Sequence, residues 1–207
     1  MSVTSRMVGF SHRPGLGAGS ARWATCLLPA RWRLLRQRVA LGETVLTTLG
    51  LVQVRRTRAC VIARTAVKGE LEAALQIALR RLADYSGGDN CEGLAVRVAR
   101  PVLLRPDASG RWLVQIGLPS EYSRFSAPVP CNHKVRILAQ PPETLAIMRL
   151  SGPAQRSERA RGEGVILAAI ADSLWIASGT PVLRLCALPG LLPWSGRFEL
   201  AVPVAAA

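Results

Sequence analysis

The stretch VQVRRTRACVIARTAVKGELEAALQIALRRLADYSGG (residues 52–88) changes its hydrophobic pattern at Lys68-Gly69. Before this point, Val54 to Val67 has the β-rich composition of a strand and is bounded by glycine. After it, Glu70 to Tyr85 is predicted to be a helix, because apolar residues recur every three or four positions at Leu71, Leu75, Ala78, Leu79 and Leu82. Ser86-Gly87-Gly88 then ends the helix, since glycine can adopt the left-handed conformation of a C-terminal cap.

The same order of elements occurs twice along the chain. In the first half the helix is followed by strands over Leu94–Leu104 and Arg111–Leu118, with a Gly-containing turn between them that predicts a hairpin. The second half is expected to hold two strand pieces, a less regular helix and two closing strands, over Lys134–Leu150, Ser157–Ser178, Pro181–Cys186 and Arg197–Val204. Two such halves would bury their apolar sheet faces against each other. We therefore predict an α+β fold, a distorted antiparallel β-barrel of two pseudo-repeated strand-helix-strand-strand halves flanked by two helices.

The first 41 residues differ from the rest in composition. They hold seven arginines and no acidic residue, whereas residues 42–207 have the length and composition of one folded domain. Three readings of this segment stay open: an organelle-targeting peptide, a basic arm that lies on a membrane surface, or a wrongly assigned start of translation. Most of the segment is expected to be disordered. Localisation is left open with them, and the cytoplasm is favoured.

The net charge of +14 does not by itself indicate a nucleic-acid partner. Of the 27 basic residues only Lys68 and Lys134 are lysine, and an Arg, Ala, Gly and Pro bias of this kind is what a GC-rich genome produces. The arginines are scattered through strand-like segments, where alternate side chains are expected to face solvent, and are not interleaved with aromatic residues. We expect no nucleic-acid partner, and no apolar run reaches the roughly 20 residues of a transmembrane helix.

The five cysteines are an odd number without a CxxC pair. Neither a zinc site nor a disulfide framework is indicated, and reduced, mostly buried thiols are expected.

Several segments, in order, resemble the SOUL haem-binding family over roughly Glu43 to Val204. The segments that carry the resemblance are Val52–Arg56, Leu82–Asn90, Ala99–Val102, Leu118–Tyr122, Pro128–Pro130 and Leu150–Gly152. The sequence departs from the family pattern at Val98-Ala99, at Gly196–Leu200 and at Cys186, and these departures put motif-specific chemistry in doubt.

The resemblance implies a non-enzymatic domain that binds haem, a related tetrapyrrole or another flat apolar molecule in a cleft beside the first helix. On that helix we predict Gln76, Leu79, Arg80 and Ala83 as ligand-binding residues, with Arg80 facing a carboxylate. The competing reading places Leu79 in the core and Arg80 in solvent. Animal members of the family have an arginine on this helix and a lysine near the C-terminal loop beside the propionates. The matching positions here are Gln76 and Leu192, so that clamp is either missing or rebuilt from Arg80 and Arg81.

His133 and Cys131, which share one loop, are weak candidates for axial ligands of iron. Haem is a possible cofactor that folding does not require. No Ser-His-Asp or Cys-His set is evident, because a nucleophile needs an adjacent, oriented base. We predict no catalytic residues, although Glu121 and Glu199 are the carboxylates to inspect for hydrolysis.

Two further hypotheses accompany this monomeric binding module. One is a small-molecule effector-sensing or protein-interaction module of the same barrel fold that does not bind haem. The other is a hydrolase that uses Glu121 or Glu199.

Overall fold

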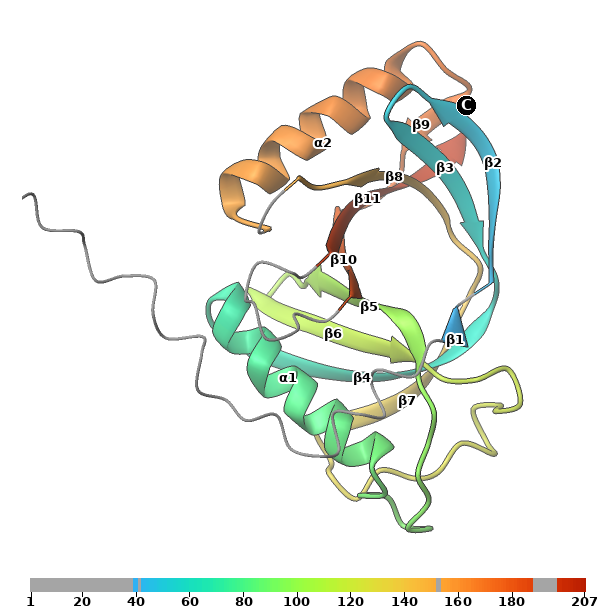
Figure 1. The fold of residues 1–207 in the computed structure, drawn as a ribbon, viewed down its shortest axis with the longest axis vertical. Helices are drawn as coiled ribbons and strands as arrows, with labels where there is room; N and C mark the ends of the chain where they lie inside the picture. The colour runs from blue at the N-terminus through green and yellow to red at the C-terminus, as the bar shows by residue number, and fades with distance from the viewer. Residues whose placement is uncertain (1–38, 41, 152–153, 188–196) are drawn as a thin grey trace, which may run out of the picture.

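The computed structural model describes residues 39–40, 42–151, 154–187 and 197–207, which form strands and two helices (Figure 1). In chain order these are β1 (Val39–Ala40), β2 (Glu43–Leu49), β3 (Val52–Thr57), β4 (Cys60–Lys68), α1 (Leu71–Ser86), β5 (Ala99–Pro106), β6 (Arg111–Gly117), β7 (Val135–Gln140), β8 (Thr144–Arg149), α2 (Arg156–Ala171), β9 (Trp175–Ala177), β10 (Val182–Ala187) and β11 (Arg197–Ala206).

The strands form one strongly curled sheet, and both helices lie on its outer face (Figure 1). The main path of the sheet runs β2-β3-β8-β11-β10-β5-β6-β4-β7, and every pair along it is antiparallel. Helix α1 packs on β4 and β6, and α2 packs on β8, β9 and β11. The predicted α+β distorted barrel with two flanking helices is confirmed.

Without β2, the strand order is symmetric about the β10–β5 pair, because equivalent strands of the two halves lie at equal distances from that pair. The first half supplies β3, β4, α1, β5 and β6, and the second supplies β7, β8, α2, β10 and β11. Within each half the second, third and fourth strands are neighbours, whereas β3 pairs with β8 and β7 pairs with β4. The two halves thus exchange their first strands and meet at the β5–β10 pair. The predicted pseudo-repeat is present, and this exchange joins its halves.

The curled sheet buries apolar side chains on both faces. The larger core lies between the sheet and the helices and includes Ala78, Leu82 and Ile166. A smaller cluster lies on the concave side and consists of Leu103, Leu145, Ile147, Val182 and Ala201. The concave face is therefore an interior and not a solvated surface.

Local sequence signals explain the first helix and the first hairpin. Helix α1 begins one residue after the predicted start, and its C-terminal Gly87 N–H donates to Ala83 O at 2.8 Å. In the β5–β6 turn the Asp107 carboxylate accepts from the Ser109 and Arg111 N–H groups, both at 2.9 Å. Gly110 in that turn has φ +72°, a conformation that favours glycine.

The second helix ends earlier than predicted. The expected helix over Ser157–Ser178 was too long, because α2 ends at Ala171 and Trp175–Ala177 form β9 against β11. The Ser173 hydroxyl donates to Ile170 O at 2.8 Å and accepts from Trp175 N–H at 3.2 Å. Serine thus offers the backbone an alternative to helical hydrogen bonds at this point.

No helix in the described part of the chain is long and apolar enough to span a membrane. The arginine-rich segment lies outside the described residues except for Val39–Ala40, which pair in parallel with β5. Its predicted boundary and role stay predictions.

Candidate functional site

The four ligand-binding residues predicted on α1 divide into two pairs. Leu79 and Ala83 are 5% and 1% exposed and belong to the core between α1 and the sheet. Gln76 and Arg80 are exposed, and Ile77 beside them is 45% exposed. The solvent-facing surface of the helix at this point is therefore made by Gln76, Ile77 and Arg80.

Arg81 has a role in holding α1 to the sheet. Its Nη1 donates to Thr65 Oγ1 and to Ala66 O on β4, both at 3.2 Å. Of the two arginines considered for a rebuilt carboxylate clamp, Arg80 is the exposed one. Leu192, the other clamp position, lies outside the described residues.

His133 and Cys131 lie on the loop between β6 and β7, and both are exposed. This loop is tied to the end of α1, because Tyr85 Oη donates to Pro128 O at 3.0 Å and Asn90 forms a bridge with Pro130. Within the described ranges no group of three or more His, Cys, Asp or Glu side chains could hold a metal ion.

The expectation of mostly buried thiols is wrong for the four described cysteines. Cys91 and Cys131 are exposed, and Cys60 and Cys186 are partly exposed. Local desolvation and a hydrogen bond with the Cys91 thiol raise the pKa of the Cys131 thiol. Burial is also the first cause that raises the pKa of the Cys186 thiol, to about 12.

The two carboxylates singled out for hydrolysis have different surroundings. The Glu121 side chain is 55% exposed and pairs with Arg97 at 3.2 Å on the surface. The Glu199 side chain is 12% exposed and pairs with Arg184 at 3.2 Å and with Arg55 at 3.8 Å. Glu199 therefore lies in a buried ion network, and Glu121 does not.

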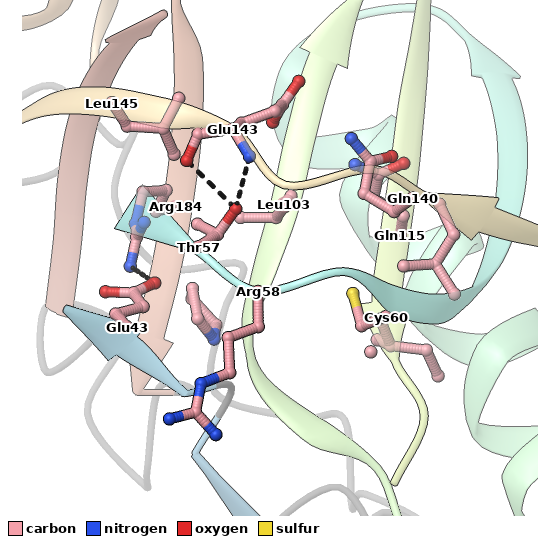
Figure 2. Close-up of a pocket in the computed structure, with 14 residues that line it drawn as sticks. Glu43, Thr57, Arg58, Cys60, Leu103, Gln115, Gln140, Glu143, Leu145 and Arg184 are labelled. Carbon is pink, nitrogen blue, oxygen red and sulfur yellow. Dashed lines mark hydrogen bonds and ion pairs between the residues drawn. The ribbon is translucent and has the colours of Figure 1, made fainter. Parts of the chain in front are cut away.

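A small pocket opens on the concave side of the sheet, between strands of both halves (Figure 2). Its apolar wall includes Ile62, Leu103, Ile116 and Leu145, and its polar lining includes Glu43, Thr57, Arg58, Cys60, Gln115, Gln140, Glu143 and Arg184. The enclosed space measures about 20 Å³, which is room for about one water molecule. A tetrapyrrole macrocycle does not fit there.

Arg184 is the centre of the ion network beside this pocket. It is 2% exposed, its Nη2 donates to Glu43 Oε1 at 2.7 Å, and its Nε donates to Glu199 Oε2 at 3.2 Å (Figure 2 shows the Glu43 contact). Arg55 joins both carboxylates from β3, at 3.2 Å from Glu43 and 3.8 Å from Glu199. The expectation that strand arginines face solvent is wrong for Arg184, because its strand has buried faces on both sides.

Glu143 forms a second polar cluster at the rim. Its backbone N–H donates to Thr57 Oγ1 at 2.9 Å (Figure 2). Its carboxylate pairs with Arg105. Burial raises the pKa of the Cys60 thiol, and the Glu143 charge raises it further. The rim is thus fixed by contacts between β3, β5 and the start of β8.

A larger groove lies on the outer face, between α2 and the sheet. It encloses about 200 Å³ and is lined by Pro106, Trp112, Arg159, Glu163, Pro181, Leu183 and Leu200. The Arg159 guanidinium carbon stands 5.4 Å from the centroid of the Trp112 ring. Arg159 Nε is buried and has no hydrogen-bond partner among the residues that the structure describes, and burial lowers the pKa of this guanidinium. Neither this groove nor the concave pocket is lined by a residue of α1.

The family model of the SOUL heme-binding proteins matches residues 43–182, from the start of β2 into β10. The chain belongs to the SOUL heme-binding family. The match covers most of the described residues, including α1 and its predicted ligand-binding side chains. No curated protein matches this SOUL-family chain.

Several solved structures share the fold at low sequence identity. The EcmrR C-terminal domain has a TM-score of 0.56 and 8% identity, and the match covers 77% of this chain and 100% of that chain. EcmrR in a complex with DNA has a TM-score of 0.55 and 10% identity, with 76% and 59% covered. A hydrolase from Listeria innocua has a TM-score of 0.55 and 12% identity, with 77% and 94% covered. At these identities the likeness shows the fold of this SOUL domain and does not extend to its function.

Sequence reasoning missed the concave pocket and its charges. One signal was available, since Arg184 interrupts the apolar run of β10 and a buried arginine requires partners. Nothing local to β10 identifies those partners, because Glu43 lies 141 residues away along the chain.

Proposed function

We propose that this domain is a non-enzymatic binding module for haem or a related flat apolar ligand. The ligand would lie against the outer surface of α1. The observation that carries the proposal is the family match over residues 43–182, which spans this helix. On the helix surface, Ile77 offers apolar contact between the polar side chains of Gln76 and Arg80. Apolar area removed from water contributes about 25 cal/mol per Å², with or without coordination of a metal.

The exposed residues match the two chemical parts of such a ligand. Ile77 would contact the ring, and the Arg80 guanidinium would bind a carboxylate through two parallel hydrogen bonds. Leu79 and Ala83 would support the site from the core beneath, and Gln76 would lie at its edge. His133 is our candidate for an axial ligand, and Cys131 on the same loop is the alternative. Bound haem iron would supply redox or gas-binding chemistry, whose character depends on that ligand.

A haemin titration of the full chain tests this proposal. We expect a saturable Soret change, and Arg80→Ala should weaken binding about tenfold because a charge-assisted hydrogen bond is lost. Arg161→Ala, which removes a 66% exposed arginine on α2, is the matched control and should bind like the wild type. A featureless titration at micromolar protein would remove the haem proposal.

The axial ligand needs a separate readout. If His133 coordinates iron, His133→Ala will shift the Soret maximum, and Cys131→Ser will leave it unchanged. The reverse pattern assigns Cys131. If neither variant moves the maximum, both candidates are eliminated while ring binding on α1 stands.

The second candidate function is small-molecule sensing without haem. It is favoured by the outer groove of about 200 Å³, where Arg159 lies over Trp112 and its Nε has no hydrogen-bond partner in the described part of the chain. An aromatic wall beside a guanidinium suits a small aromatic molecule with a hydrogen-bond acceptor. Mass spectrometry of molecules that co-purify with the protein, together with no Soret response, would support this candidate. Loss of the co-purified molecule in Trp112→Ala would assign it to the groove.

A further inference from the structure

We propose that the concave pocket is a separate binding site for a small carboxylate, whose oxygen is bound by Arg184 and Gln115. The proposal does not depend on haem binding, because the pocket lies inside the curled sheet while α1 lies on its outer face (Figure 1). Two residues that line the pocket each have a buried hydrogen-bond donor without a partner within the described residues, namely Arg184 Nη1 and Gln115 Nε2.

Both donors belong to side chains that are almost completely buried. Arg184 and Gln115 are each 2% exposed. Two of the three nitrogens of the Arg184 guanidinium are occupied by Glu43 and Glu199, so its free Nη1 is a donor held in a fixed orientation. Buried donors in native proteins nearly always have a partner, and these two belong to residues of the same pocket.

The sheet register places the two donors in one row. Gln115 pairs with Leu103, and Leu103 pairs with Arg184, across the neighbouring strands β6, β5 and β10. Cross-strand partners project to the same face, and the outer two strands of such a trio lie about 10 Å apart. An acceptor above Leu103 would therefore lie between a guanidinium and an amide.

The charge around the pocket favours an anion. Four guanidiniums lie in or beside it, those of Arg55, Arg58, Arg105 and Arg184, against the three carboxylates of Glu43, Glu143 and Glu199. Each carboxylate already pairs with one or more of these arginines. These groups have a net charge of +1, and the exposed Arg58 at the rim contributes the additional positive charge.

The size and the walls restrict the rest of the ligand. The enclosed space admits about one oxygen-sized group, and apolar residues beside it are Ile62, Leu103 and Leu145. A carboxylate with a short apolar tail meets both conditions, with its tail directed toward the rim at Arg58 and Cys60. A large aromatic acid would require the strands to separate.

Cys60 lines this pocket and provides a reporter for occupancy. We expect n-butyrate to slow alkylation of Cys60 by iodoacetamide in a saturable way, measured on the Cys60 peptide by mass spectrometry at fixed pH. Butyramide, which has the same shape without the charge, and chloride at equal ionic strength should protect much less. Exposed Cys91 is the internal control and should react at the same rate in every buffer.

Two matched substitutions complete the test. Gln115→Leu should weaken butyrate protection about tenfold, because one buried hydrogen bond to the ligand is lost. Gln155→Leu makes the same chemical change at an exposed position just before α2, outside the pocket, and should leave protection within about twofold. Both variants should keep the haemin response of the wild type, so a failure here is distinguishable from a failure of the haem proposal. The inference is overturned if butyrate protects no better than chloride, in which case the pocket holds water alone, or if both variants weaken protection equally.

Discussion

Arg184 on β10 lies directly opposite Leu103 on β5, at the centre of the palindromic strand order where the two halves of the sheet meet. The same relation continues one strand outward, where Gln115 pairs with Leu103 and Glu199 pairs with Arg184. The first half thus presents an amide and a leucine at positions where the second half presents a carboxylate and a guanidinium. The pseudo-repeat preserves backbone geometry and allows the concave face to differ in charge between its halves.

Removing the Arg184 guanidinium should strongly destabilise the fold. Arg184→Ala removes the more deeply buried of the two arginines that the Glu43 and Glu199 carboxylates share, and Arg55 remains beside them. Breaking a buried ion pair by removing one partner costs about 3–5 kcal/mol. Arg97→Ala breaks an exposed pair with Glu121 and should change the free energy of unfolding by less than about 1 kcal/mol. Urea unfolding of both variants checks this contrast, and equal losses would contradict a structural role for the buried network.

The Tyr85 hydroxyl joins the end of α1 to the β6–β7 loop. Tyr85→Phe leaves the Pro128 carbonyl without this donor and should cost about 1 kcal/mol in urea unfolding. Burial, followed by the charges of Tyr122 and Glu92, raises the pKa of Tyr85 above its ordinary value of 10.0. A raised folded-state pKa means that this contribution is complete below pH 10 and is lost only at more alkaline pH. A cost that already falls between neutral pH and pH 9 would contradict this assignment.

Two glycines of α2 should respond differently to alanine. No atom of another described element lies within 4 Å of a Cβ atom built at Gly164, so Gly164→Ala should raise the free energy of unfolding by about 0.5–1 kcal/mol through helix propensity. A Cβ at Gly162 would stand 3.1 Å from Leu150 Cδ2 and 3.2 Å from Leu200 Cδ2 and Met148 Cε. Gly162→Ala should therefore gain nothing or lose stability. Thermal unfolding of both variants decides the matter, and equal gains would show that α2 is not packed closely against the sheet at Gly162.

The stability that the Asp107 carboxylate gives to the β5–β6 turn should depend on pH in the acidic range. Hydrogen bonds from the Ser109 side chain, the Arg111 backbone and the Arg111 side chain lower the pKa of Asp107 from 3.8 to about 2. Because the folded pKa is depressed, the stabilisation is present above pH 3.8 and is lost as the pH falls toward about 2. An NMR titration of the Asp107 carboxyl should give the midpoint near 2, and the stability difference between wild type and Asp107→Asn should vanish over the same range. A midpoint near 3.8 would show that the turn is open in solution.

The elements that the sequence predicted well are those whose signal is local. Helix α1 has an apolar face at helical spacing and a glycine end, and the β5–β6 hairpin has Asp107 and Gly110 in its turn. Helix α2 was predicted less accurately, because it buries only Gly162, Ile166 and Ile170 among its described residues. With so narrow a buried face, the helical period is weak, and local hydrogen bonds of Ser173 end the helix where the sequence pattern continues.

The ligand-binding residues predicted on α1 also show what a local sequence pattern leaves undetermined. The helical period places Leu79 and Ala83 near Gln76 and Arg80, but it does not say how far the buried face extends around the helix. Packing against β4 and β6 decides that Leu79 and Ala83 lie in the core and that Arg80 stays in solvent.

By itself, the sequence determined the two half-repeats, their helices and hairpins, and the family, because periodicity, turn residues and segment order act over a few neighbouring positions. The tertiary structure decided that β3 and β7 change places between the halves, and that Arg184 meets a carboxylate 141 residues away. Pairing between distant strands leaves no periodic mark in either strand. The charge of a strand residue likewise does not reveal whether its face of the sheet is open to water or enclosed by the curl.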